Sequence, residues 1–234
     1  MAAEASPNKR KAIVDALMDL ASKRPWNEIE IKDIAQAANV SLAEFRDLFP
    51  SKGAVLGAFS REIDRQVLEG TTDDLAGEPA RERIFDVMMR RFDALAPYKE
   101  ALRRIFRDLQ YDLASLAALN QVSLNSQRFM LAAAGIPIEG PLGGLKLQGA
   151  VLVYANTMRT WLDDDDPTLA RTMARLDREL RRGERILEQA EDVRRLTAPL
   201  RAVGRALMES RRPSRRSSRR RTEDGDAESP AAAI

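Results

Sequence analysis

The stretch IAQAANVSLAEFRDLFPSK, residues 34–52, decides the fold of the N-terminal part of the chain. A helix-turn-helix needs small residues where its helices cross, a turn residue that tolerates positive φ, and an N-cap for the second helix. Ala35 and Ala38 are small enough for the crossing. Asn39 suits the turn and Ser41 suits the N-cap. The apolar side would be formed by Ile34, Val40, Phe45 and Phe49. This spacing predicts two short helices joined by a tight turn, which fits a DNA-reading motif and an ordinary helical hairpin equally well.

Helical periodicity extends outward from this stretch, and strand alternation is almost absent. One helix is expected over about 8–23, ending at Pro25, and another from Ser51 to about Glu69. The segment 70–79, GTTDDLAGEP, has the composition of a linker, and we place a domain boundary there. We therefore predict an all-α fold that begins with a three-helix helix-turn-helix domain over 8–69.

The second domain, residues 80–209, has the pattern of a helical bundle. We expect helices over 80–95 and 120–134, and between them a helix with Pro97 in its first turn. The inner face of that middle helix would be formed by Leu102, Ile105, Phe106, Leu109, Leu113 and Leu116. The loop 135–144 lacks the glycine spacing of a phosphate-binding loop.

The last two helices of the bundle carry long apolar seams. One is expected over about 145–162, and the next would open with Asp166 as N-cap and Pro167 at its first position. The seams predict a homodimer, although they could instead close the core of a single chain. The expected interface residues are Val151, Met158, Trp161, Met173, Leu176 and Leu180.

A regulatory ligand would lie between helices of the second domain. The expected pocket residues are Met88, Phe92, Phe106, Leu109, Phe129 and Tyr154. Their apolar character favours a small hydrophobic effector, but all six would serve equally well as core residues.

The C-terminal part of the chain is basic. Residues 193–207 are amphipathic, which fits a helix packed on the body and, alternatively, a membrane-surface or lipid-sensing helix. Residues 210–234 are Arg-rich and of low complexity, so we expect a disordered basic tail. Residues 211–234 hold 7 Arg against 4 acids, which leaves 31 Lys+Arg against 32 Asp+Glu in the rest. Any basic footprint on the folded part must therefore come from local clustering.

The absence of certain residue types excludes several kinds of chemistry. The chain has no Cys and no His, which removes thiol nucleophiles, imidazole bases and zinc sites with N or S ligands. A hydrolase using carboxylates would need a paired constellation that the sequence does not show. The run Asp163–Asp166 could offer oxygen ligands, but the dipole of a following helix explains it without metal. We expect no enzyme, no cofactor and no metal, and, without an apolar span or leader, a cytoplasmic protein.

The run IEIKDIAQAANVSLAEFRDLFPSKGAVL, residues 29–56, resembles the N-terminal domain of TetR-family transcriptional regulators. These proteins show a similar I-A-x-x-A-x-V-S run and end it in F-x-S-K. The resemblance implies a ligand-responsive homodimeric repressor, whose recognition helix, Ser41–Leu48, enters the major groove of a palindromic double-stranded DNA operator. The DNA-binding residues that it implies are Lys32, Ser41, Leu42, Ala43, Glu44, Arg46, Asp47 and Lys52.

Four positions depart from that pattern or oppose it. The family usually opens the first motif helix with Ser or Thr, where this chain has Glu30, which a phosphate repels. The family's tyrosine falls on Arg46, which can bind phosphate or guanine. Glu44 and Asp47 also fall on the outward side of the recognition helix, where acids oppose docking into DNA.

Residues 153–180 carry a second resemblance, to the W-x-x-D segment and following helix of ubiquinone-biosynthesis accessory proteins. Those proteins share the TetR fold, bind lipid and have an extra amphipathic helix that associates with membrane, to which residues 193–207 could correspond. The alternative function is therefore a lipid- or quinone-binding accessory protein that does not bind DNA.

Overall fold

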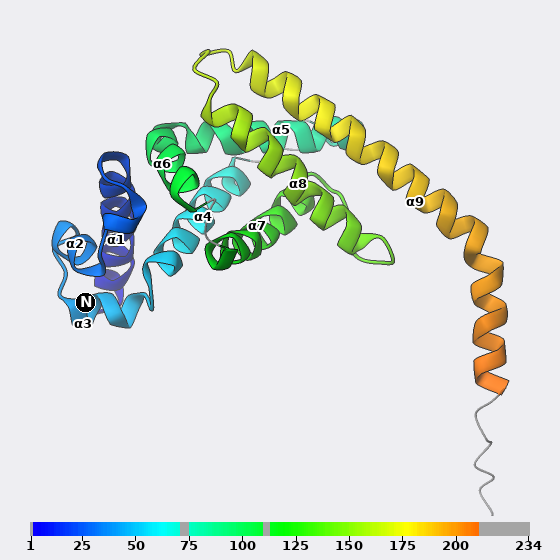
Figure 1. Ribbon diagram of the computed structural model, residues 1–234, viewed down its shortest axis with the longest axis horizontal. Coiled ribbons are helices and arrows are strands. Elements are labelled where there is room, and N and C mark those ends of the chain that lie inside the picture. The colour runs from blue at the N-terminus through cyan, green and yellow to red at the C-terminus, as the bar shows by residue number, and fades with distance from the viewer. Residues whose placement is uncertain (1, 71–74, 110–112, 211–234) are drawn as a thin grey trace, which may run out of the picture. The chain divides into compact units, whose positions relative to one another are not determined.

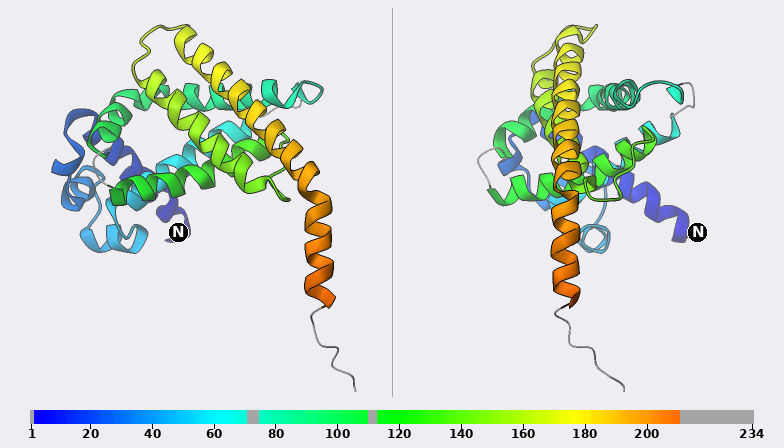
Figure 2. Two further views of the ribbon diagram at one scale, coloured as in Figure 1. Left: turned by 45° about the vertical axis from the view of Figure 1, so that its right-hand side comes forward. Right: turned by 90° about the vertical axis from the view of Figure 1, so that its right-hand side faces the viewer.

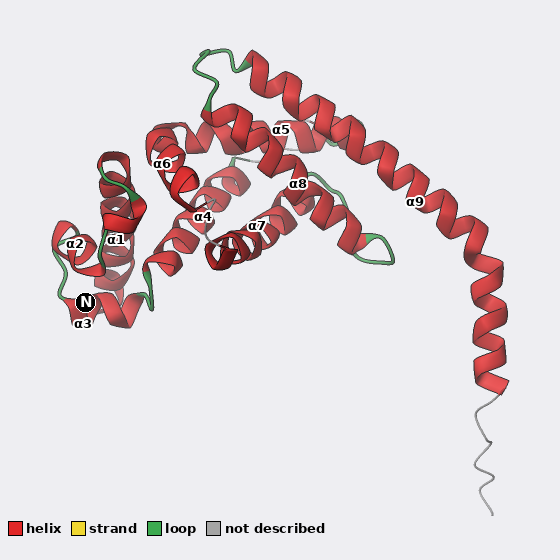
Figure 3. Cartoon of the chain, in the orientation of Figure 1, coloured by secondary structure: helices red, strands yellow, loops and turns green. Residues whose placement is uncertain are grey.

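The computed structural model of the chain describes residues 2–70, 75–109 and 113–210, and all regular structure in these ranges is helical (Figure 1 and Figure 3). Of residues 2–7, 113–115 and 196–210 it describes the backbone alone. The predicted all-α fold is confirmed for this part of the chain. The predicted disordered tail, apart from Ser210 at the end of the last helix, lies outside it.

The N-terminal helices follow the predicted order. Helix α1 (Ala2–Lys23) buries residues at helical spacing, among them Ile13 and Leu17, and it ends just before Pro25 because the residue preceding a proline disfavours helix. A 3-10 turn (Trp26–Glu28) leads to the two short helices α2 (Ile31–Ala37) and α3 (Leu42–Leu48). Helix α4 (Lys52–Glu69) then begins after Ser51, whose hydroxyl accepts a hydrogen bond from the N–H of Ala54 at 3.2 Å.

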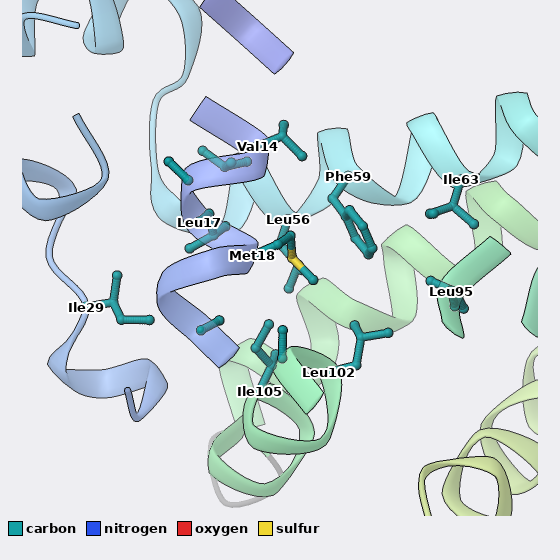
Figure 4. Close-up of a cluster of buried hydrophobic side chains, with 14 of the residues drawn as sticks. Val14, Leu17, Met18, Ile29, Leu56, Phe59, Ile63, Leu95, Leu102 and Ile105 are labelled. Carbon is teal, nitrogen blue, oxygen red and sulfur yellow. The ribbon is translucent and has the colours of Figure 1, made fainter. Parts of the chain in front are cut away.

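The N-terminal helices and the next part of the chain share one hydrophobic core. Helix α5 (Ala80–Leu95) is followed by a 3-10 turn (Ala96–Tyr98) and by α6 (Lys99–Leu109), which packs on α1. Figure 4 shows Leu17 and Met18 of α1 near Leu56 of α4 and Leu102 and Ile105 of α6. The division into two functional domains at 70–79 stays a prediction, but the two parts do not have separate cores.

Helix α7 (Leu113–Ala133) packs on α4, α5 and α8 (Gly143–Leu162). Both views in Figure 2 show α7 beside α8. The prediction that one helix carries Leu109, Leu113 and Leu116 on a single inner face is wrong. Helix α6 ends at Leu109, Leu113 begins α7, and Leu116 is 40% exposed because α7 buries a face around Gln127 and Met130 instead.

The predicted start of the last helix is also wrong. Helix α9 (Ala170–Ser210) begins after Leu169, which has a left-handed backbone with φ of 51°. The carboxylate of Asp166 accepts hydrogen bonds from the N–H and hydroxyl of Thr168, both at 2.9 Å, which makes a local turn before the helix. The carboxylate of Asp164 caps the helix instead, by accepting from the N–H and hydroxyl of Thr172 at 2.9 and 2.7 Å.

The chain divides into two compact units, residues 1–191 and 192–234, and α9 contributes to both. Residues 193–207 therefore belong to a continuous helix, although their side chains beyond 195 lie outside the described residues. Within the described helices, none is long and apolar enough to cross a membrane.

Candidate nucleic-acid interface

The helix-turn-helix is held together by its own turn and caps. Asn39 lies in the turn with φ of 53°, a conformation that Asn tolerates better than most residues. The hydroxyl of Ser41 accepts from the N–H of Glu44 at 3.2 Å, while the N–H of Ser41 donates to Oε2 of Glu44 at 2.8 Å. This reciprocal pair is a capping box. The S-x-x-E spacing that signals it is visible in the sequence, although we inferred only the Ser41 cap from it.

Glu44 is directed back toward α1 and away from the outer face of α3. Its Oε1 accepts from the ammonium of Lys9 at 2.5 Å, and its Oε2 from both groups of Ser41. The hydrogen bond from Lys9, together with those from Ser41, lowers the pKa of Glu44 to about 2. The acid that the sequence places in opposition to DNA is thus already paired with a cation, which sequence spacing did not reveal because Lys9 lies 35 residues away.

Four other residues of α3 face solvent. Leu42 is 58% exposed, and Ala43, Arg46 and Asp47 are also exposed, whereas Phe45 on the opposite side is buried. Among the described residues, none forms a hydrogen bond or ion pair with the guanidinium of Arg46. Leu42, Ala43 and Arg46 therefore stand on the surface as the resemblance predicted, and their contact with DNA stays a prediction.

Lys52 is engaged within the protein. Its ammonium donates to the backbone carbonyl of Ile29 at 2.8 Å and to that of Trp26, and it lies 4.2 Å from the centre of the Trp26 ring. Burial lowers the pKa of Lys52. The lysine of the F-P-S-K end thus ties the start of α4 to the segment before α2. Two of its three N–H donors are used in this way, so at most one remains for a phosphate.

The start of α2 is closed by internal pairs as well. The N–H of Glu30 donates to the carboxylate of Asp33 at 3.1 Å, and Asp33 also pairs with Arg24 at 3.3 Å. Glu30 itself pairs with Lys32 at 2.9 Å. The hydrogen bond from the Glu30 backbone lowers the pKa of Asp33. Lys32 is exposed, but Glu30 balances its charge, so this pair adds little net positive potential to the surface.

Behind this surface, a buried polar cluster joins four helices. The guanidinium of Arg91 (α5) pairs with Asp64 (α4) at 2.9 Å and donates to the hydroxyls of Ser60 (α4) at 3.1 Å and Tyr154 (α8) at 2.7 Å. Ser126 (α7) donates to the same Asp64 oxygen at 2.7 Å. Burial raises the pKa of Tyr154. No local sequence signal predicted this cluster, because Arg91 and Asp64 lie 27 residues apart.

The residues predicted to line a ligand pocket lie in different environments, and their contact with a ligand stays a prediction. Met88, Phe92, Leu109 and Tyr154 are buried in the core, where Phe92 stacks on Tyr154 with ring centres 5.5 Å apart. Phe129 is 56% exposed on α7. Phe106 is half-buried against the core.

A cavity of about 440 Å³ lies elsewhere, between α5, the end of α7 and the segment before α5. It falls within the range of small-molecule sites. Arg83 and Arg90 border it, and each donates to a backbone carbonyl near the C-terminal end of a neighbouring helix, at Ala134 and Gly70 respectively. The remaining lining comes from Leu75, Ala76, Asp86, Val87, Ala132, Ala133, Ala134 and Gly135.

Most of the predicted interface residues are buried within the single chain. Val151, Met158 and Trp161 of α8 face the core, as does Leu176 of α9. Leu180 is half-buried and Met173 is exposed. On α8, Leu152 is 57% exposed and lies one position beyond the predicted interface residue Val151. Among the residues of these two helices whose side chains are described, the other large exposed apolar ones are Leu145, Ile186 and Val193.

The W-x-x-D segment has a structural role at the turn between α8 and α9. Trp161 is buried beneath the ammonium of Lys99, which lies 5.2 Å from the ring centre and donates to the backbone carbonyl of Asp164. Arg103 of α6 donates to the carbonyl of Leu162 and pairs with Asp165 at 3.1 Å. No group of metal-binding side chains occurs among the described residues. These contacts explain the segment without lipid.

Comparison with known proteins supports the fold. No family model matches the chain, and no curated protein matches it in sequence. Among solved structures, a TetR transcriptional regulator from Nitrosomonas europaea ATCC 19718 matches with a TM-score of 0.59 and 24% identity, over 75% of this chain and 97% of that one. A TetR transcriptional regulator from Rhodococcus sp. RHA1 matches with a TM-score of 0.58 and 17% identity, over 76% of this chain and 96% of that one. The chain therefore has the fold of TetR transcriptional regulators.

Proposed function

We propose that the chain is a DNA-binding transcriptional regulator that acts as a homodimeric, ligand-responsive repressor in the cytoplasm. The observation that carries this proposal is the outer face of α3. Its residues Leu42, Ala43 and Arg46 stand exposed on a helix whose caps are satisfied and whose other side is buried. In a helix-turn-helix, this is the face that enters the major groove.

The charge of that face favours docking more than the sequence suggested. The carboxylate of Glu44 is neutralised by Lys9, which leaves Asp47 as the exposed acid of α3. Arg46 is exposed on the same helix, and the exposed Arg10 of α1 has its guanidinium carbon 4.7 Å from the centre of the Phe49 ring. Arg46 can bind a guanine edge or a phosphate, and Arg10 can bind a phosphate.

A homodimer would be built on α8 and α9. Leu145 and Leu152 are exposed on α8, seven residues apart and therefore on one side of the helix. Met173 and Ile186 are exposed on α9. Because most of the predicted seam residues are buried within the chain and only Met173 of them is exposed, a second copy would contact these four residues. Two such chains would present their α3 helices to a palindromic operator.

Ligand response requires that an effector bind the DNA-ready and DNA-released states with different affinity. The cavity between α5 and α7 is where a small effector would fit. Its arginines and Asp86 favour a ligand with at least one polar group, whereas the sequence favoured a small hydrophobic effector.

Selection of binding sites from a random DNA library tests the proposal. The full-length chain should enrich one palindromic sequence, and its log affinity should fall linearly with log salt, by about 0.9 per phosphate contact. A chain ending at Glu209 should select the same sequence, because the Arg-rich tail supplies only sequence-independent attraction.

Arg46→Ala provides the site-specific arm of this test. If Arg46 reads guanine, its loss should weaken binding by about 1–3 kcal/mol and relax the preference at one position; if it binds phosphate, the salt slope should fall by about 1. Arg128→Ala, which removes an exposed arginine from α7, is the matched control and should change neither. Failure to enrich any sequence, or loss of all binding with the tail, would refute the proposed function.

A further inference from the structure

The polar side chains at the first turn of α3 are largely engaged within the protein. The hydroxyl of Ser41 accepts from the N–H of Glu44 and donates to its carboxylate at 3.0 Å. The carboxylate of Glu44 is directed toward Ser41 and Lys9. Three of the roughly four acceptor sites of the Glu44 carboxylate are filled by Lys9 and Ser41, and these contacts hold it toward α1 and not toward a base edge.

The side chains that this turn does expose are both apolar. Leu42 is 58% exposed and Ala43 is exposed beside it, at the first two positions of the helix. Lone exposed leucines are ordinary on protein surfaces. This one differs by its position, because the N-terminal residues of a recognition helix are those that contact base edges.

Apolar side chains can distinguish only one feature of the major groove. Guanine, cytosine and adenine present hydrogen-bonding groups there, and the 5-methyl group of thymine is the apolar group that remains. We propose that Leu42, with Ala43 beside it, reads thymine through its 5-methyl group, so that each operator half-site contains a thymine whose methyl group contributes to affinity. This inference rests on the proposed function, because it requires α3 to enter the groove.

Arg46 sets the position of that thymine. It follows Leu42 by four residues and therefore lies on the same side of α3, about 6 Å further along the axis. Base pairs are spaced by about 3.4 Å. The thymine should therefore lie within about two base pairs of the nucleotide that Arg46 contacts.

Replacing thymine by uracil removes the methyl group and leaves every hydrogen-bonding group unchanged. The test uses the operator selected from a synthetic library, and such a library contains no 5-methylcytosine. Each thymine of the half-site is replaced by uracil in turn. Affinity should fall about fourfold at one position, the factor for removing one buried methyl-sized group, and about fifteenfold when both half-sites are changed. Thymines outside the half-sites serve as controls.

The Leu42→Ala variant links the effect to the protein. Leu42 is largely exposed, so the variant should keep its circular dichroism spectrum and unfolding midpoint. It should bind thymine and uracil operators equally at the sensitive position, whereas the wild-type chain distinguishes them. Specific binding that ignores uracil at every position, or an undiminished preference in Leu42→Ala, overturns thymine reading and leaves the proposed function standing. Failure to select any operator overturns both.

Discussion

Replacing Arg91 by methionine should destabilise the protein strongly, because it would leave the carboxylate of Asp64 buried without its cation. The side chains of Arg91 and Asp64 are only 4% and 10% exposed. Of the two described side chains that now bind the carboxylate of Asp64, only Ser126 would remain. Removing one member of a buried ion pair typically costs about 3–5 kcal/mol. Since a domain is usually stable by about 5–15 kcal/mol, the loss would be a large fraction of the total.

Chemical denaturation followed by circular dichroism measures this loss. The denaturant midpoint of Arg91→Met should fall while the slope stays unchanged, since the surface exposed on unfolding is nearly the same. Lys11→Ala is the control, because Lys11 pairs with Asp15 at 2.7 Å on the surface of α1, where such pairs contribute about 0–1 kcal/mol.

The double variant Arg91→Met, Asp64→Leu separates the unpaired charge from the loss of packing. With no charge left in the core, it should be more stable than Arg91→Met alone. The reasoning is refuted if Arg91→Met costs less than about 1 kcal/mol, the range of a surface pair. It is refuted equally if the double variant is less stable than the single one.

Three further results are expected. Lys52→Met should lower the free energy of unfolding by about 1–3 kcal/mol, because two carbonyls lose their donor. The variant should leave the salt slope of DNA binding unchanged, and a slope reduced by about 1 would mean that this lysine binds phosphate. Because the pKa of Glu44 is lowered to about 2 in the folded chain, its contribution to stability is present above pH 4.5 and lost as the pH falls toward 2. Between pH 4.5 and 2, the unfolding midpoint of Glu44→Gln should therefore change less with pH than the midpoint of the wild type or of Asp47→Asn. Leu152→Glu should convert a dimer into a folded monomer in sedimentation velocity, whereas Phe129→Glu, at an equally exposed site on α7, should not.

The helix-turn-helix could be predicted because its determinants are local. Asn39 in the turn and Ser41 at the N-cap act on residues within four positions of themselves, so a short window of sequence contains the cause of each. The start of α9 could not be placed in this way. Its cap, Asp164, binds Thr172 eight residues away, across a reversal at Leu169, and the nearer Asp166 was the stronger local signal.

The candidate site was predicted less well than the fold, because spacing identifies a face and not what lies against it. Periodicity places Val151 on an apolar seam, but such a seam can face either the core or a second chain. In the structure, Val151 is buried in the core. The sequence shows the charges of Glu44 and Lys52 but not whether they are free to meet DNA. That depends on Lys9 and on the carbonyls of Trp26 and Ile29, which only the folded chain brings near.

The core shared by α1, α4 and α6 has a consequence for how the molecule melts and how it can be divided. The N–H of Trp26 donates to Asp108 of α6 at 2.7 Å, and Ile105 of α6 is buried in the same cluster as Leu17 of α1. Excising residues 1–70 would expose that apolar surface to water, so the fragment should not fold by itself. The helix-turn-helix should therefore lose its structure together with α6, in one cooperative transition.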